Sequence, residues 1–101
     1  MADYVRVAGT ADIPPGSGHI AEVTGQTIAI FNSDGTFFAI DNTCLHRGGP
    51  LGEGELERDV VTCPWHGWQY NVKTGVSLTN PSVSVKTYQV KVEGADVKIL
   101  L

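Results

Sequence analysis

Two short stretches decide the fold of this chain, Cys44-Leu45-His46-Arg47-Gly48-Gly49-Pro50-Leu51 and Cys63-Pro64-Trp65-His66-Gly67-Trp68. Each stretch carries one cysteine and one histidine. One residue separates them in the first stretch, and two residues separate them in the second. Together they contain both cysteines and two of the three histidines of the protein. Such a concentration of thiol and imidazole groups in a small chain indicates a metal centre.

The chemistry of these four side chains leaves two cofactors open. Thiolate and neutral imidazole both bind borderline-soft metals, and the neighbouring glycines and prolines let the backbone turn tightly around a small centre. The centre could be one tetrahedral zinc ion, or a two-iron, two-sulfide cluster with cysteines on one iron and histidines on the other. Zinc fingers usually keep like ligands together, whereas each stretch here mixes them. A disulfide between Cys44 and Cys63 would leave the histidines unexplained.

The order C-x-H, 16 further residues, then C-x-x-H resembles the Rieske iron–sulfur proteins. Gly48-Gly49-Pro50-Leu51 and Gly67-Trp68 are most similar to soluble Rieske-type ferredoxins and to the Rieske domains of ring-hydroxylating oxygenases. The resemblance extends more loosely over the whole chain. It implies one [2Fe–2S] cluster, with cysteines on an inner ferric iron and histidines on an outer iron near the surface. The implied metal ligands are Cys44, His46, Cys63 and His66.

The resemblance also bears on the reduction potential. Two imidazoles in place of thiolates remove two negative charges from the ligand set, which raises the potential above that of an all-cysteine cluster. Respiratory members carry an extra disulfide where this chain has Gly49 and Trp65, and a serine where it has Trp68. With fewer hydrogen bonds to sulfur, we predict a potential near roughly −150 mV, at the low end of the Rieske range. Tyr70 matches a tyrosine that donates to a cysteine sulfur in high-potential members, which would make the shift incomplete.

Further residues around the two stretches are expected to surround the cofactor. Trp65 and Trp68 would shield the cluster or form a docking surface, and core packing is an equal alternative for Trp68. Arg47 would contact a carboxylate of a partner or remain solvated, Pro81 lies where the family has a loop that covers the cluster, and His19 is predicted to be structural or exposed. The predicted cofactor-binding residues are Arg47, Gly48, Gly49, Trp65, Gly67 and Tyr70.

Length, charge and composition narrow the class of protein. A chain of 101 residues predicts one domain. Its net charge of −4 argues against binding to nucleic acid. This charge fits either an acidic electron carrier or a protein whose charge serves solubility alone. No apolar run is long enough for a transmembrane helix, and the first residues lack the apolar segment of a signal peptide. With both cysteines used as ligands there is no disulfide framework, so we expect a cytoplasmic protein.

Short alternating or apolar runs separated by turn residues predict an all-β fold. The pattern predicts a β-sandwich or small barrel. The resemblance implies a Rieske-like β-sandwich in two parts, with a cluster-binding subdomain from Ile40 to about Leu78 inserted between framework strands. Residues 53–59 are predicted to be an exposed connection, and Asn32-Ser33-Asp34-Gly35 a tight turn. The predicted strands are 4–8, 19–24, 27–31, 36–40, 60–62, 69–72, 76–78, 84–92 and 97–101.

By resemblance, the chain would be a one-electron carrier between a flavin-dependent reductase and a terminal oxygenase, for example one that hydroxylates aromatic rings. We expect a monomeric electron-transfer component rather than an enzyme, since the chain has no room for a substrate pocket or a nicotinamide site. One alternative is a permanent Rieske-like subunit of a larger redox enzyme such as a nitrite reductase. The other is a zinc-stabilised interaction module.

Overall fold

The structure of the chain is a computed structural model, which describes residues 4–23, 25–43, 49–65 and 67–100. In these ranges the regular elements are short strands and two single-turn 3₁₀ helices, which confirms the predicted all-β class. The elements in chain order are β1 (Tyr4–Gly9), η1 (Thr10–Asp12), β2 (Gly18–Val23), β3 (Gln26–Ser33), β4 (Thr36–Asp41), η2 (Leu51–Glu53), β5 (Glu55–Glu57), β6 (Val60–Thr62), β7 (Gln69–Asn71), β8 (Thr87–Tyr88), β9 (Val90–Glu93) and β10 (Asp96–Leu100).

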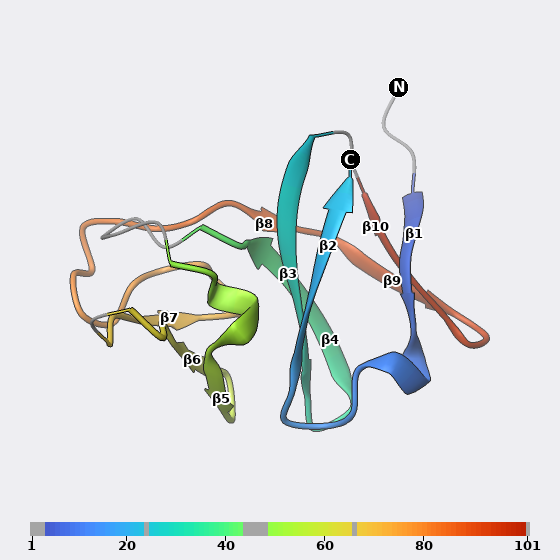
Figure 1. Ribbon diagram of the computed structural model, residues 1–101, viewed down its shortest axis with the longest axis horizontal. Helices are drawn as coiled ribbons and strands as arrows, with labels where there is room; N and C mark the ends of the chain where they lie inside the picture. Colours follow the sequence, from blue (N-terminus) through green and yellow to red (C-terminus); the bar gives the residue numbers. More distant parts are fainter. Residues whose placement is uncertain (1–3, 24, 44–48, 66, 101) are drawn as a thin grey trace.

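These strands form three antiparallel sheets. The first has the order β1-β10-β9, the second β2-β3-β4-β8, and the third β5-β6-β7. The first two sheets make up one part of the molecule, and the third lies on the other side of the second sheet (Figure 1). The molecule therefore consists of a framework of two sheets with a third sheet beside it.

Strand β3 is the centre of this arrangement because both of its faces are buried. Side chains of a strand alternate between faces. Ile28 and Ile30 accordingly belong to a core shared with β1 and β10, whereas Ala29 and Phe31 belong to a second core shared with the third sheet. Full burial of each large side chain contributes roughly 1.5–3 kcal/mol. An uninterrupted apolar run thus serves two cores at once.

The β3–β4 hairpin shows how local sequence fixes the framework. Its two turn residues, Asp34 and Gly35, have φ angles of 52° and 93°, the positive values that a type I′ turn requires. Buried Asn32 accepts the Gly35 N–H at 2.7 Å and donates to the carbonyl oxygen of Ile13 at 2.7 Å. The predicted turn at Asn32–Gly35 is confirmed, and strand β3 runs two residues beyond its predicted end.

One predicted loop is in part a strand. Residues 53–59 were expected to form an exposed connection, but Glu55–Glu57 is β5, paired antiparallel with β6. The alternation is present in the sequence, because Glu55 and Glu57 are exposed while Leu56 packs against the core. A single apolar residue among acids was too weak a signal for a strand.

Two predicted strands are also divided differently. The alternating run 84–92 is not one strand, since β8 pairs with β4 and β9 pairs with β10. The chain passes from the second sheet to the first at Gln89, which a period-2 pattern alone cannot reveal. Residues 76–78 form only isolated bridges, Tyr70 with Ser77 and Val76 with Ser84.

Asp59 of the third sheet bonds to the framework and pairs with a lysine of its own sheet, and these contacts predict an acid-sensitive fold. Asp59, in the β5–β6 turn, accepts the Ser33 hydroxyl at 2.8 Å and lies 3.2 Å from the Lys73 ammonium. These two contacts lower the pKa of the Asp59 carboxyl below its usual value. A carboxyl whose pKa is lowered in the folded state stabilises the fold fully above its usual pKa, and this stabilisation is lost as the pH falls from there through the lowered pKa.

We therefore expect the free energy of unfolding of the wild-type chain to fall more steeply between about pH 6 and about pH 3 than that of Asp59→Asn. Urea titrations at both pH values measure this difference. Asp34→Asn, in the adjoining hairpin turn, is the matched control, because asparagine tolerates a positive φ. Equal pH dependence in the wild-type and Asp59→Asn chains would contradict the prediction.

Candidate metal centre

The second loop, residues 63–68, is the tip of the β6–β7 hairpin. The Cys63 N–H donates to the Trp68 carbonyl at 2.7 Å, which closes the loop directly beyond the last strand pair, Thr62 and Gln69. Gly67 has a φ angle of 75°, a conformation that favours glycine. The Cys63 side chain is only 1% exposed and belongs to the core beneath the third sheet. The hairpin therefore presents this thiol at its inner side.

The first loop, residues 43–50, connects the end of β4 to η2. An antiparallel bridge between Thr43 and Pro50 closes it, so its two ends lie side by side. Several predicted site residues lie outside the described residues, and their placement stays a prediction. They are Cys44, His46, Arg47 and Gly48 of the first loop and His66 of the second.

The two loops meet at Gly49. A Cβ atom at this position would lie 2.8 Å from Cys63 Sγ and 2.9 Å from Trp65 Cγ, closer than real Cβ atoms approach other atoms. Only glycine lets the first loop come this near to the second. The predicted cofactor residues Gly49, Cys63 and Trp65 are thus brought together, although 13 residues lie between Gly49 and Cys63 in the sequence.

The surroundings of the Cys63 sulfur suit a metal-bound thiolate. The Trp65 N–H lies 3.4 Å from Sγ and donates to it, a contact that stabilises negative charge on sulfur. Tyr70, on β7, is completely buried in the same core as Cys63. A buried sulfur with a backbone donor, facing a loop that carries a second cysteine and a histidine, fits the mixed donor set of a [2Fe–2S] cluster.

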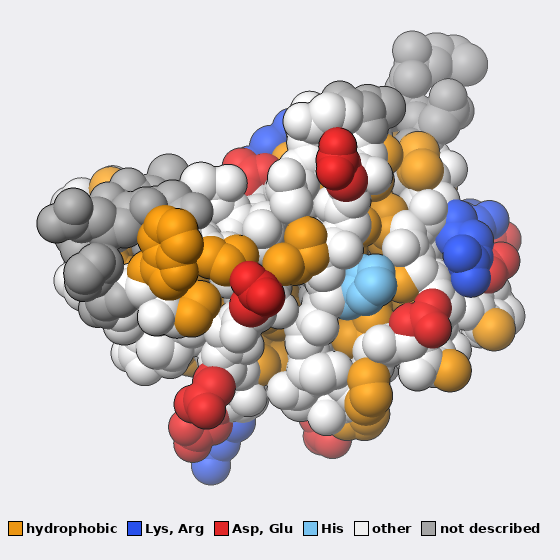
Figure 2. Space-filling view, in the orientation of Figure 1, with side chains coloured by type: hydrophobic (Ala, Val, Ile, Leu, Met, Phe, Trp, Pro, Cys, Tyr) orange, Lys and Arg blue, Asp and Glu red, His pale blue; other side chains and the backbone are white. Residues whose placement is uncertain are grey.

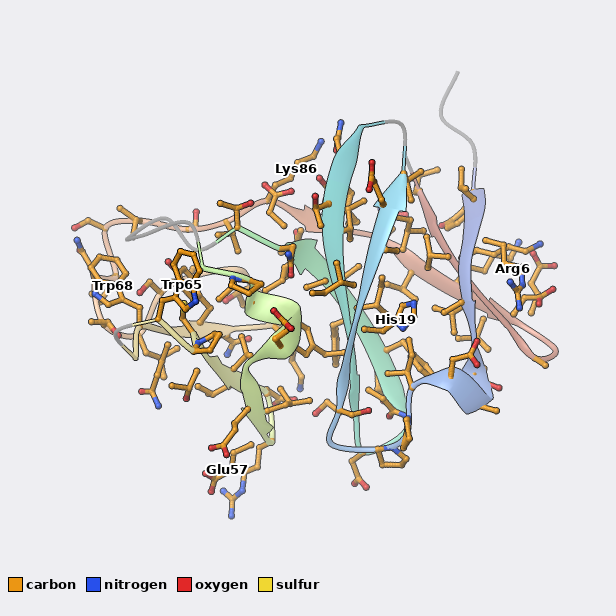
Figure 3. The ribbon with its side chains drawn as sticks, in the orientation of Figure 1. Arg6, His19, Glu57, Trp65, Trp68 and Lys86 are labelled. Atoms are coloured by element: carbon orange, nitrogen blue, oxygen red, sulfur yellow. The ribbon has the colours of Figure 1, made fainter. Side chains whose placement is uncertain are left out.

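The two tryptophans at this end of the molecule differ in environment. Trp65 is 51% exposed, and Figure 3 shows both rings at the end of the molecule that carries β6 and β7. Trp68 is half-buried and packs against the core, so part of its role is structural. Hydrophobic side chains gather at the same end of the visible face (Figure 2). Trp65, beside exposed Pro64, is available for contact with another protein.

A buried serine that the sequence did not single out holds a third loop, residues 77–83, beside the second. The Ser77 hydroxyl donates to the Gln69 carbonyl at 3.1 Å and accepts the Asn80 N–H at 3.1 Å. Gln69 in turn donates its N–H to Thr79 Oγ1 at 3.0 Å. Exposed Pro81 lies in this loop. A serine between Val76 and Leu78 is a weak signal, because its partner Gln69 lies eight residues away in the sequence.

Asn42 is a second residue that sequence reasoning passed over. It is 7% exposed and accepts the Leu51 N–H on its carbonyl oxygen and the Gly52 N–H on Oδ1, both at 2.7 Å. Both donors follow the first loop, whereas Asn42 precedes it. Asparagine side chains often form hydrogen bonds with nearby backbone groups. An asparagine directly before the first loop was therefore the one sequence signal for this closing role.

His19 lies on β2, opposite Ile30, and is half-buried. Figure 3 shows it away from Trp65 and Trp68. This half-buried position away from the two loops agrees with the prediction that His19 is structural or exposed. Among the described residues, no helix is long and apolar enough to cross a membrane.

The fold and the site together define a small all-β protein in which two loops, each with one cysteine and one histidine in its sequence, meet at Gly49. A family model for the Rieske [2Fe–2S] domain matches residues 3–89. The biphenyl dioxygenase ferredoxin subunit of Pseudomonas sp. (strain KKS102) is 36% identical over 98 residues, which cover 95% of this chain and 90% of that protein. The chain belongs to the Rieske [2Fe–2S] family.

Solved structures agree with this assignment. The ferredoxin in a complex of reduced oxygenase and oxidised ferredoxin of carbazole 1,9a-dioxygenase superposes with a TM-score of 0.87 at 31% identity, covering 95% of this chain and 91% of that one. A structure described as an NADH-dependent nitrite reductase small subunit from Mycobacterium tuberculosis gives 0.90 at 20% identity, covering 100% and 96%, and shows the fold alone. The chain is a Rieske-type ferredoxin with a [2Fe–2S] cofactor, an electron-transfer component and not a catalyst.

Proposed function

We propose that Cys44, His46, Cys63 and His66 hold the [2Fe–2S] cluster, and that the unit from about residue 40 to about residue 78 is the subdomain that binds it. The contact of Gly49 with Cys63 and Trp65 carries this proposal, because it brings the loops of both ligand pairs together. When bound, the cluster accepts and returns one electron. The chain itself supplies the buried thiol, its backbone donor and the close packing of the two loops, which keeps water from the sulfur.

We further propose that this chain passes electrons from a flavin-dependent reductase to a terminal oxygenase, as a monomer in the cytoplasm. The curated relatives are ferredoxin subunits of dioxygenase systems, and one similar ferredoxin is solved together with its oxygenase. A net charge of −4 suits weak, salt-sensitive contacts with partners that must be exchanged. Cysteines that serve as ligands suit the reducing cytosol.

The first experiment measures iron, acid-labile sulfide and EPR of anaerobically purified protein before and after dithionite. We expect two irons and two sulfides per chain, no signal as isolated, and a Rieske-type signal on reduction. Potentiometry on the same sample tests the predicted value near roughly −150 mV, and a value well above zero would contradict it. One zinc per chain without sulfide would overturn the proposed cluster and favour the zinc-stabilised module.

Electron delivery is tested by stopped flow with the reduced chain and a panel of oxidised terminal oxygenases from the biphenyl, phenylpropionate and carbazole systems. Rapid reoxidation by at least one of them, slowed by added salt, is expected. Reoxidation no faster than by buffer, for every oxygenase of the panel, would contradict the proposed acceptor class.

Trp65 is predicted to be a main contact for the oxygenase. Its indole is half-exposed beside the two loops, and tryptophan is among the residues that dominate binding at interfaces. We expect Trp65→Ala to raise the KM for this ferredoxin about tenfold or more in oxygen-uptake assays. The variant keeps the backbone N–H that bonds to Cys63, so the EPR signal is a check on the site.

Val92→Ala is the matched control for this variant. Val92 is 46% exposed on β9, in the framework rather than beside the loops. Its truncation is expected to leave the KM unchanged. An unchanged KM for Trp65→Ala would remove this residue from the docking surface.

A further inference from the structure

Directly beyond the Thr43–Pro50 bridge, Asn42 ties the two ends of the first loop together. Its N–H donates to the Thr27 carbonyl of β3 at 3.1 Å, which anchors it to the central sheet. Its carbonyl oxygen accepts the Leu51 N–H and its side-chain Oδ1 accepts the Gly52 N–H. The start of the loop, its end and the framework are therefore joined through one buried side chain and its backbone.

The residues around Asn42 leave little freedom for this closure to shift. Gly52 lies so close to Ile20 that a Cβ atom there would be 2.3 Å from Ile20 Cγ1 and 3.0 Å from Asn42 Oδ1. Helix η2, which contains Gly52, packs against β2 and β3. The residue before Asn42 is held as well, because the Tyr88 hydroxyl lies 2.7 Å from Asp41 Oδ1. Burial and this contact raise the pKa of Tyr88 to about 12, so the hydroxyl keeps its proton and donates.

We propose that Asn42 is a positioning residue for the metal centre: its two oxygens fix how the first loop presents its cysteine and histidine to the second loop. This inference rests on the proposed ligand set. An unpaired buried N–H is unfavourable, so loss of the Oδ1 acceptor would drive Gly52 to seek another partner and displace the end of the loop. Groups that orient metal ligands influence affinity and the electronic properties of the centre.

The chain offers a matched control in Asn32. This residue is also buried, at 4% exposure, and its side chain also holds backbone groups, namely the Ile13 carbonyl and the Gly35 N–H. It lies in the β3–β4 hairpin of the framework rather than at a loop that carries proposed ligands. Removing either carboxamide should destabilise the chain, but only Asn42 should alter the centre.

The test compares Asn42→Leu, Asn42→Asp and Asn32→Leu in the cluster-loaded protein. For Asn42→Leu we expect shifted EPR g values and loss of the visible absorbance to an iron chelator about tenfold faster or more than in the wild type. Asn42→Asp keeps an oxygen acceptor for Gly52 and should restore the wild-type g values. Asn32→Leu should unfold at a lower temperature but keep them. If Asn42→Leu yields no folded protein, Asn42→Ser, whose side chain is too short to reach Gly52, replaces it.

The outcomes separate this inference from the proposed function. Wild-type g values in Asn42→Leu, or equal shifts in Asn42→Leu and Asn32→Leu, would overturn the positioning role while the ligand set stands. Failure of Asn42→Asp to restore the g values would overturn it as well. A wild-type protein without iron and sulfide would end the proposed ligand set itself.

Discussion

Replacement of Cys63 by serine is expected to abolish the Rieske-type EPR signal and most of the bound iron and sulfide. The sulfur is buried, accepts the Trp65 N–H and lies beside Gly49, so it is the one proposed ligand whose surroundings are described. Serine is close in size to cysteine and leaves the packing nearly intact, but its hydroxyl does not ionise readily to replace a thiolate. A cofactor that binds only the folded chain also stabilises it. We therefore expect Cys63→Ser to unfold at the lower temperature of the cluster-free protein.

Val61→Ala is the matched control for this substitution. Val61 is fully buried on β6, two residues before Cys63 and in the same core. Its truncation should cost about 2 kcal/mol or more of stability yet retain the cluster signal. Metal analysis, EPR and thermal unfolding of both variants distinguish loss of a ligand from loss of packing. Full iron content and an unchanged signal in Cys63→Ser would show that this cysteine is not a ligand.

Gly49→Ala is expected to have the second large effect, because it adds one methyl group where the loops touch. The new Cβ would lie 2.8 Å from Cys63 Sγ, 2.9 Å from Trp65 Cγ and 3.0 Å from Trp65 Cβ. Overpacking of this kind costs typically about 1–3 kcal/mol, and relief requires the two loops to separate. We expect lower cluster occupancy, shifted g values and faster loss of the cluster to chelators, measured on freshly reconstituted protein.

Gly35→Ala provides the contrast for Gly49→Ala. Gly35 has a φ angle of 93° with no atom within 4 Å of an added Cβ, so its substitution strains the backbone by about 1–2 kcal/mol without a clash. The two variants should lose similar stability, but only Gly49→Ala should change the EPR signal. Identical signals in Gly49→Ala and the wild type would mean that the contact between the loops does not shape the centre.

The sequence alone determined the chemistry of the site and the class of fold. The mixed Cys–His pairs left zinc or a [2Fe–2S] cluster open, their resemblance to the Rieske proteins implied the cluster, and the family match confirms that cofactor. Alternation predicted the framework strands, and Asn32–Gly35 predicted the hairpin turn. These signals are local: each depends on residues that neighbour one another along the chain.

Contacts between distant residues were decided only by the tertiary structure. The period-2 pattern of 84–92 could not show that the chain changes sheets at Gln89, because alternation identifies a buried face but not the strand that pairs with it. A lone Leu56 between two acids could not show that β5 completes the third sheet. The approach of Gly49 to Cys63 and the closure of the first loop by Asn42 depend on how η2 packs on β2 and β3. The sequence therefore determined which donors are present, and packing between sheets decided where the backbone that carries them is held.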